Sequence, residues 1–179
     1  MIKGLKTLHD KNIVHRDIKC ANVFLMKSGD LKLGDLNVSK VGKKGELMST
    51  QTGTPYYASP EVWKDQPYNA MSDIWSAGCV LYEMVMLNPP FKGRDMNDLY
   101  TKITRGVYPT LSAQFSSDLN HIIKCMLQQR PTDRPTVDKI LAMKQVQRHI
   151  PDDLKDVKND ADAPLLGTIR LPFGNMNKI

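Results

Sequence analysis

The chain has 179 residues, 41% hydrophobic and 25% charged, which favours one folded domain with a tail over a disordered or fibrous chain. Its formal charge of +6 arises from 25 basic and 19 acidic residues that are dispersed along the sequence, so we expect no nucleic-acid partner. The 3 cysteines lack zinc-ligand or paired spacing, and the longest apolar segment, 74–87, is too short and too interrupted to span a bilayer, so we expect a reducing compartment and no membrane partner.

The first ten residues predict the end of a helix, because Ile2, Leu5 and Leu8 recur at helical spacing. We expect this helix to begin upstream of Met1. The segment that follows has the sequence I-V-H-R-D-I-K-C-A-N-V-F at 13–24. It places acid, base and amide side chains among apolar residues, which favours a loop with a chemical role over a simple turn.

Two short β-prone runs, 23–26 and 31–33, follow this segment. The residues between them, K-S-G-D, suit a tight turn, so we predict a β-hairpin. The hairpin would place Asp17 and Asn22 where its first strand begins and Asp35 where its second strand ends.

The rest of the chain predicts a mostly helical body. Residues 35–61 are polar and rich in turn-forming residues, which predicts a long loop. Residues 72–87 are apolar nearly all round, as in a helix buried at the centre of a domain. Apolar residues at helical spacing predict two further helices, one over 119–127 and one after Thr136, whose side chain can cap it.

Residues 151–164 are charged and poor in large apolar side chains, and an apolar stretch follows at 164–173. We therefore expect a folded domain over residues 1–148 and a poorly ordered tail over residues 149–179. Two interpretations of the apolar stretch stay open. It folds back on its own domain, which we favour, or it docks in a groove or at a strand edge of a partner.

Residues 15–22, H-R-D-I-K-C-A-N, fit the pattern H-R-D-x-x-x-x-N of a protein-kinase catalytic loop. Four more motifs follow in the order typical of eukaryotic protein kinases: Asp35-Leu36-Asn37, Ser59-Pro60-Glu61, Asp73-Ile74-Trp75, and Arg134 in R-P-T-D-R-P. A chance match to all of them in order is very improbable. Residues 1–148 therefore resemble the large, C-terminal lobe of a eukaryotic protein kinase, a mainly α lobe with a small β-hairpin.

The resemblance implies an enzyme that uses ATP and Mg²⁺. Asp17 would accept or orient the proton of the incoming hydroxyl, and Lys19 would offer its charge to the γ-phosphate. Asn22 and Asp35 would supply oxygen ligands to Mg²⁺, which takes such ligands together with phosphates. Lys19, Asn22, Phe24 and Asp35 are expected to contact the nucleotide.

The resemblance also implies serine or threonine as the acceptor. Tyrosine kinases usually carry another residue at the position of Lys19. In the family, the threonine at the position of Thr54 bridges the catalytic aspartate and lysine and shapes the hydroxyl pocket. Asn37 departs from the family's glycine, but asparagine tolerates a left-handed backbone, so we expect a stiffer hinge that still permits metal binding.

Arg16, next to Asp17, implies regulation by phosphorylation of the loop that follows, since a guanidinium group can hold a phosphate through two hydrogen bonds. Thr50 matches the usual regulatory position of the family. The alternative is that Thr50 is a solvated loop residue without a regulatory role.

Four residues are expected to have structural roles. His15 would pack in the interior, and Asp73 would open the buried helix. Glu61 and Arg134 would form a buried ion pair that fastens the end of the loop. Loss of one partner would leave a buried charge, at a cost of about 3–5 kcal/mol.

Within the kinases, G-T-P-Y-Y-A-S-P-E-V-W at 53–63 and S-D-I-W-S-A-G-C-V-L-Y-E-M at 72–84 most resemble the NIMA-related serine/threonine kinases. This resemblance implies protein substrates with serine or threonine acceptors and cell-cycle or cytoskeletal partners. It also implies a cytoplasmic location, with cytoskeletal, ciliary and nuclear sites as further options.

The sequence contains neither the G-x-G-x-x-G loop nor the V-A-I-K strand of a kinase small lobe. We expect the small lobe to precede Met1 in a longer kinase. The alternative is that the chain is a non-catalytic module that binds partners through its helical surface or its tail. The intact residues Asp17, Lys19, Asn22 and Asp35 favour the kinase.

Overall fold

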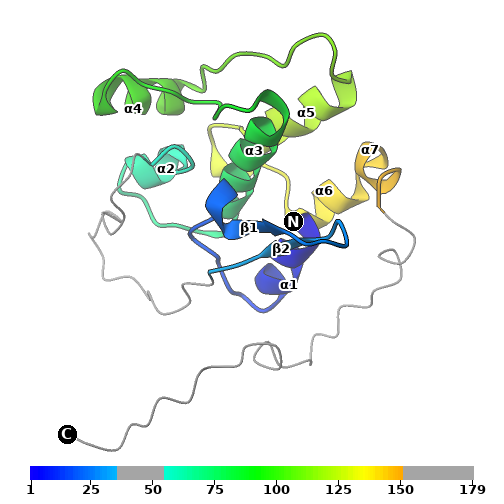
Figure 1. Ribbon diagram of the computed structural model, residues 1–179. Coiled ribbons are helices and arrows are strands. Elements are labelled where there is room, and N and C mark those ends of the chain that lie inside the picture. Colours follow the sequence, from blue (N-terminus) through cyan, green and yellow to red (C-terminus); the bar gives the residue numbers. More distant parts are fainter. Residues whose placement is uncertain (36–54, 151–179) are drawn as a thin grey trace, which may run out of the picture.

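A computed structural model describes residues 1–35 and 55–150, and these residues form a mainly helical domain with one two-stranded antiparallel sheet. The expected class, mainly α with a small hairpin, is confirmed. Figure 1 shows the helices gathered around α3, with the hairpin and α1 on one side. In chain order the elements are α1 (Ile2–Asp10), the 3-10 turn η1 (Cys20–Asn22), β1 (Val23–Leu25), β2 (Leu31–Leu33), α2 (Pro60–Trp63), α3 (Ala70–Met86), α4 (Met96–Arg105), α5 (Ser117–Met126), the 3-10 turn η2 (Pro131–Asp133), α6 (Val137–Ala142) and α7 (Lys144–Gln147).

Several predictions concern residues outside the described ranges. They are the expected roles of Thr50, Thr54 and Asn37 and the expected structure of the tail beyond residue 150. In the part of the chain that is described, no helix is long and apolar enough to cross a membrane.

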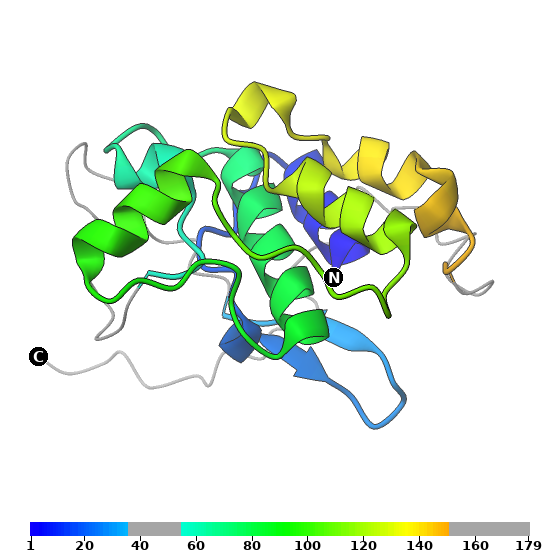
Figure 2. The same ribbon diagram turned by 90° about the horizontal axis from the view of Figure 1, so that it is seen from above.

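Helix α3 runs through the centre of the domain, as Figure 2 shows. Asn69 caps its start: the side chain accepts a hydrogen bond of 2.8 Å from the backbone N–H of Met71, and the Asn69 N–H donates to the Ser72 hydroxyl at 3.3 Å. Every residue from 72 to 80 is buried, so the predicted central helix is confirmed. One core cluster packs α3 against α1, α5 and α6, and a second packs it against α4 and Phe91.

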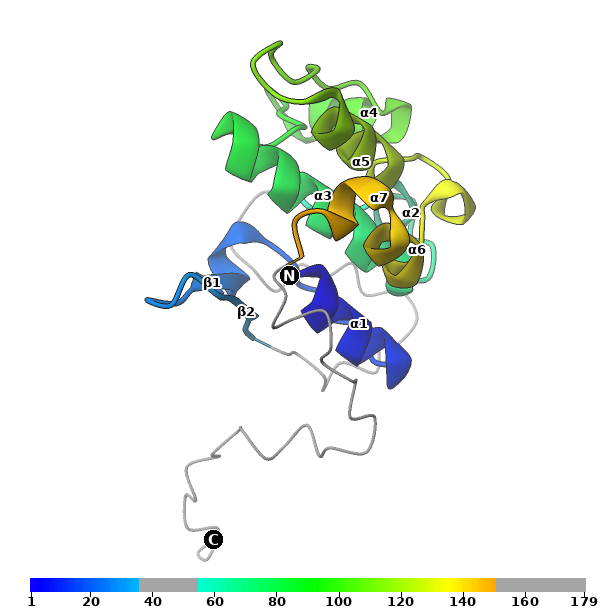
Figure 3. The same ribbon diagram turned by 90° about the vertical axis from the view of Figure 1, so that its right-hand side faces the viewer.

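The predicted hairpin is also confirmed, with a first strand that ends at Leu25. Val23 pairs with Leu33, and Leu25 with Leu31. The turn closes with a 2.8 Å hydrogen bond from the Met26 N–H to the Asp30 carbonyl, and Gly29 takes a φ of 88°, which glycine adopts without strain. Figure 3 shows the hairpin beside α1 at one edge of the molecule.

The predicted helices α5 and α6 are present, and the Thr136 side chain caps α6 by accepting a 3.3 Å hydrogen bond from the Lys139 N–H. Sequence analysis did not predict α4. This helix buries only Leu99 and Ile103, so its apolar stripe is narrow. The sequence features that mark this helix more clearly are the residues at its two ends. The Asp95 side chain caps the first turn, and Gly106, which follows the last turn, takes a φ of 67°.

Candidate active site

The loop between α1 and β1 is fastened to α3 by Asp73, which is fully buried. Its two carboxylate oxygens accept hydrogen bonds from the backbone N–H groups of His15 and Arg16, at 2.9 and 3.0 Å. The Nε2 atom of His9 lies 2.9 Å from the same carboxylate, and the Tyr68 hydroxyl donates to it at 3.1 Å. Arg16 has a φ of 70°, a conformation that costs a non-glycine residue energy, so these bonds hold the loop in a strained shape.

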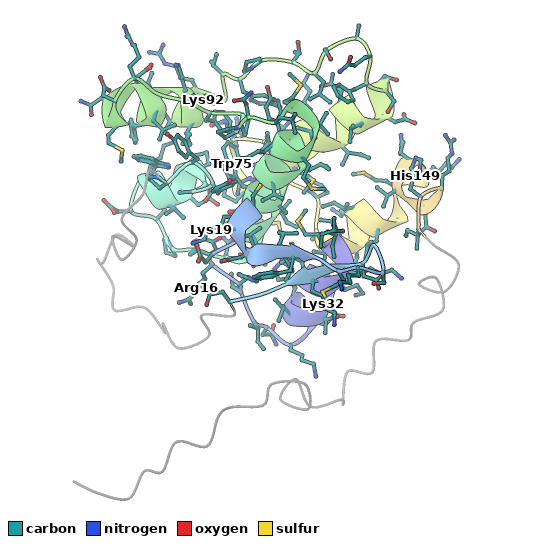
Figure 4. The ribbon with its side chains drawn as sticks, viewed as in Figure 1. Arg16, Lys19, Lys32, Trp75, Lys92 and His149 are labelled. Atoms are coloured by element: carbon teal, nitrogen blue, oxygen red, sulfur yellow. The ribbon has the colours of Figure 1, made fainter. Side chains whose placement is uncertain are left out.

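Three of the predicted site residues, Asp17, Lys19 and Asn22, lie together in this loop. The Lys19 Nζ atom is 2.9 Å from Oδ2 of Asp17, and the Asn22 amide donates to the same oxygen at 3.0 Å. The Asn22 amide also donates to the Asp17 backbone carbonyl at 2.8 Å. Figure 4 shows Lys19 and Arg16 on the same side of the molecule, near the hairpin. The Lys19 ammonium group and the Asn22 amide thus both contact the Asp17 carboxylate.

Asp35 follows β2 and is exposed. A 2.9 Å hydrogen bond from the Gly34 N–H to the Asn22 carbonyl extends the hairpin ladder and places Asp35 one residue beyond that pair. Because the Asn22 amide nitrogen faces Asp17, its Oδ1 atom is the one that can coordinate a cation. An amide oxygen and a carboxylate fit the preference of Mg²⁺ for hard oxygen ligands.

No three His, Cys, Asp or Glu side chains within residues 1–35 and 55–150 converge to form a metal site. Magnesium binding by Asn22 and Asp35 would therefore need oxygens from elsewhere, and nucleotide phosphates and water are the usual source.

Phe24, on β1, is 53% exposed, and the neighbouring apolar side chains of the hairpin are exposed as well. We name this surface the hairpin patch; it consists of Phe24, Leu25, Met26 and Leu31. A contact between Phe24 and a nucleotide stays a prediction.

The expected ion pair between Glu61 and Arg134 is confirmed, with both residues 3% exposed. Two guanidinium nitrogens donate to the two carboxylate oxygens, at 2.7 and 2.8 Å, and the Ser72 hydroxyl donates to Glu61 at 2.7 Å. Burial alone would raise the pKa of Glu61, but the Arg134 charge and hydrogen bonds outweigh it and lower the pKa. The remaining donors of the guanidinium group bind backbone carbonyls of Met71, Gln128 and Gln129.

His15 is buried, with 1% of its surface exposed, as expected for a packing residue. Its Nδ1 atom lies 3.4 Å from the Asp17 backbone N–H, and its Nε2 atom has no hydrogen-bond partner within the described residues.

Sequence analysis missed a contact beside the loop between α1 and β1. The Tyr57 hydroxyl donates to Glu83 on α3 at 2.7 Å, and the Ser76 hydroxyl donates to the Tyr57 carbonyl at 2.8 Å. Burial, followed by the bond to Glu83, raises the pKa of Tyr57, and burial raises the pKa of the nearby Cys20 thiol. Cys20 therefore stays a protonated thiol at neutral pH. Tyr57 and Glu83 are 26 residues apart, so a pattern in the local sequence could not predict their hydrogen bond.

Comparison with known proteins gives a consistent result. The sequence matches the protein kinase domain over residues 1–146. It is 43% identical over 148 residues to serine/threonine-protein kinase Nek4 of Mus musculus, which covers 82% of this chain and 19% of the relative. It is 44% identical over 150 residues to Nek5 of Homo sapiens, an alignment that covers 83% of this chain and 21% of the relative. It is 45% identical over 139 residues to Nek1 of Mus musculus, an alignment that covers 77% of this chain and 12% of the relative. The chain thus spans about a fifth or less of these relatives' length.

Proposed function

This chain belongs to the protein kinase family and is similar to the Nek serine/threonine kinases, and we propose that it is the large lobe of a kinase that phosphorylates serine and threonine in proteins. The observation that carries this proposal is the cluster in which Lys19 and Asn22 both bind the Asp17 carboxylate. The proposed lobe covers residues 1–148, and residues 149–179 form a tail.

In the proposed reaction the acceptor oxygen forms a bond to the γ-phosphorus of ATP, and the bond between that phosphorus and the bridging oxygen of ADP breaks. Asp17 orients the acceptor hydroxyl and takes its proton. Lys19 stabilises the charge on the transferring phosphoryl group. Thr54, from the loop, shapes the pocket for a serine or threonine hydroxyl.

Mg²⁺, when bound with ATP, neutralises phosphate charge. Asn22 and Asp35 are the residues of this chain that would hold it. The support is their proximity: the hydrogen bond between Gly34 and Asn22 brings the segments that carry the two oxygen donors side by side.

We place regulation at Arg16 and Thr50. The Arg16 backbone is fixed by its bond to Asp73, so a phosphate on Thr50 that paired with the Arg16 guanidinium would order the loop against a rigid partner. Similarity to Nek kinases supports cell-cycle or cytoskeletal partners.

A non-catalytic interaction module is the second candidate, and the hairpin patch favours it, since exposed apolar surfaces often mark binding sites. The two proposals differ in whether Asp17 is needed. If the chain is an interaction module, the Asp17→Asn variant would bind its partner as well as the unmodified chain does. If it is part of a kinase, the variant would lose phosphate transfer.

The test is phosphate transfer from ATP·Mg to generic protein substrates, by the chain alone and by the chain joined at Met1 to the glycine-rich small lobe of a serine/threonine kinase. We expect transfer by the joined protein to serine and threonine, none to tyrosine, and none by the chain alone. A joined protein that folds but transfers no phosphate would leave the interaction module as the better account.

A further inference from the structure

Helix α5 carries a histidine and a cysteine that are one helical turn apart. His121 is exposed and Cys125 is half-buried. Residues four apart lie on the same face of a helix, and here the Cys125 Sγ atom is 3.5 Å from the His121 Nε2 atom. Cysteine sulfur and histidine nitrogen are both ligands that Zn²⁺ takes in proteins.

The distance between these two atoms suits a zinc ion. Zinc bonds to cysteine sulfur at about 2.3 Å and to histidine nitrogen at about 2.1 Å, with tetrahedral geometry. A tetrahedral angle between bonds of these lengths separates the two ligand atoms by about 3.6 Å. The observed separation of 3.5 Å therefore lets the pair hold one ion with little movement of either side chain.

The core fixes the helix that carries the pair. Ile122, Ile123 and Met126 of α5 are buried in the two core clusters that also contain residues of α3. Because both ligands are on one fixed helix, an ion that binds the first ligand meets the second at a high effective concentration. This arrangement favours binding through both side chains over binding through either one alone.

We propose that His121 and Cys125 form a binding site for Zn²⁺. The Cys125 sulfur binds as a thiolate, so the thiol proton passes to water when the ion binds. No third His, Cys, Asp or Glu side chain joins the pair among residues 1–35 and 55–150, so water fills the other two positions of the tetrahedral shell.

This site is separate from the candidate active site. Figure 3 shows α5 and the hairpin on opposite sides of α3. The ligands also differ in kind, because Mg²⁺ takes hard oxygen ligands whereas sulfur and imidazole nitrogen suit zinc. The inference therefore goes beyond the proposed function and does not depend on it.

The experiment titrates the reduced 179-residue chain, without nucleotide and with excess Mg²⁺, with Zn²⁺ and separately with Cd²⁺. Cd²⁺ reports sulfur ligation through the ultraviolet charge-transfer absorption of its bond to a thiolate. We expect one Zn²⁺ per chain. His121→Gln and Cys125→Ser should each weaken Zn²⁺ binding at least about tenfold, because each leaves a single ligand. Cys125→Ser should also abolish the Cd²⁺ absorption.

Three further variants separate geometry from composition. His121→Gln/Lys124→His keeps one histidine and one cysteine on α5, but adjacent helix residues do not face each other, so it should bind Zn²⁺ as weakly as His121→Gln. Cys125→His should keep Zn²⁺ binding and lose the Cd²⁺ absorption. Cys20→Ser removes the other half-buried thiol and should change neither signal. Circular dichroism checks that each variant is folded.

A chain that binds no Zn²⁺ would overturn the inference, and so would Zn²⁺ affinity that is unchanged in His121→Gln or restored by Lys124→His. A Cd²⁺ absorption that depends on Cys20 in place of Cys125 would overturn it as well. The proposed kinase would stand in each case, since phosphate transfer uses Mg²⁺ and residues outside α5.

Discussion

Glu61 and Arg134 are each 3% exposed, and two guanidinium nitrogens of Arg134 donate to the two carboxylate oxygens of Glu61. Neither charge is stable at that depth without its partner. Because the pair links α2 to the segment after η2, it joins parts of the chain that are 73 residues apart.

Removal of one charge should therefore be costly. We expect Glu61→Gln to lower the free energy of unfolding by about 3–5 kcal/mol, since it leaves the Arg134 charge buried. The double variant Glu61→Gln/Arg134→Met, which removes both charges, should be more stable than Glu61→Gln. Urea denaturation measures both, and a double variant as unstable as the single one would contradict the role of the unpaired charge.

The lowered pKa of Glu61 has a consequence for stability against pH. Its folded-state pKa is below the ordinary value of 4.5, so the unfolded state binds the proton more readily. The resulting stabilisation is complete above about pH 6 and is lost as the pH falls through the folded pKa. Thermal unfolding from pH 7 to pH 3 should show this loss, and the double variant should show a smaller one. Equal losses would contradict the assignment.

The residues of the candidate site differ in how far sequence could predict them. Asp17 and Asn22 belong to a motif of fixed spacing, so a local pattern was enough. Tyr68 and His9 reach Asp73 through packing of separate segments, and neither stands in a pattern that distinguishes it from any surface tyrosine or histidine.

Among the elements, α3 and α5 approach so closely that only glycine fits at position 78. A methyl group there would be 2.9 Å from Cβ of Met126 and 3.0 Å from Cδ2 of Leu127. Gly78→Ala should therefore destabilise the domain by about 1–3 kcal/mol, although alanine favours helices. Gly4→Ala, in the exposed part of α1, should be neutral or stabilising in the same denaturation experiment. Equal effects of both changes would mean that α3 and α5 pack less tightly.

Prediction of elements succeeded where burial imposes a strong pattern. Residues 72–87 are apolar nearly all round because α3 is buried. The two β-prone runs of the hairpin are separated by a recognisable turn. Helix α4 lies at the edge of the second core cluster and buries only Leu99 and Ile103, so tertiary packing, rather than a broad apolar stripe, decides its presence.

At the scale of the whole molecule, the hairpin patch is an exposed apolar surface that begins at Phe24, two residues after Asn22 of the candidate site. We expect the isolated chain to self-associate through it. Leu25→Lys changes a side chain that is 73% exposed, so it should reduce self-association in sedimentation experiments without loss of stability. Leu87→Lys, at the C-cap residue of α3 and outside the hairpin patch, changes a side chain that is 83% exposed; it is the matched control and should have no such effect. An equal reduction by both variants would indicate that general charge, not the patch, is responsible.

The central claim is that the cluster around Asp17 transfers phosphate. The measurement that tests it most directly is the rate of transfer from saturating ATP·Mg by the protein joined to a small lobe, with and without Asp17→Asn. The substitution keeps the shape of the side chain and removes the base, so we predict a loss of at least about a hundredfold in kcat with little change in the KM for ATP. A variant that keeps a rate within a few fold of the original would contradict the account.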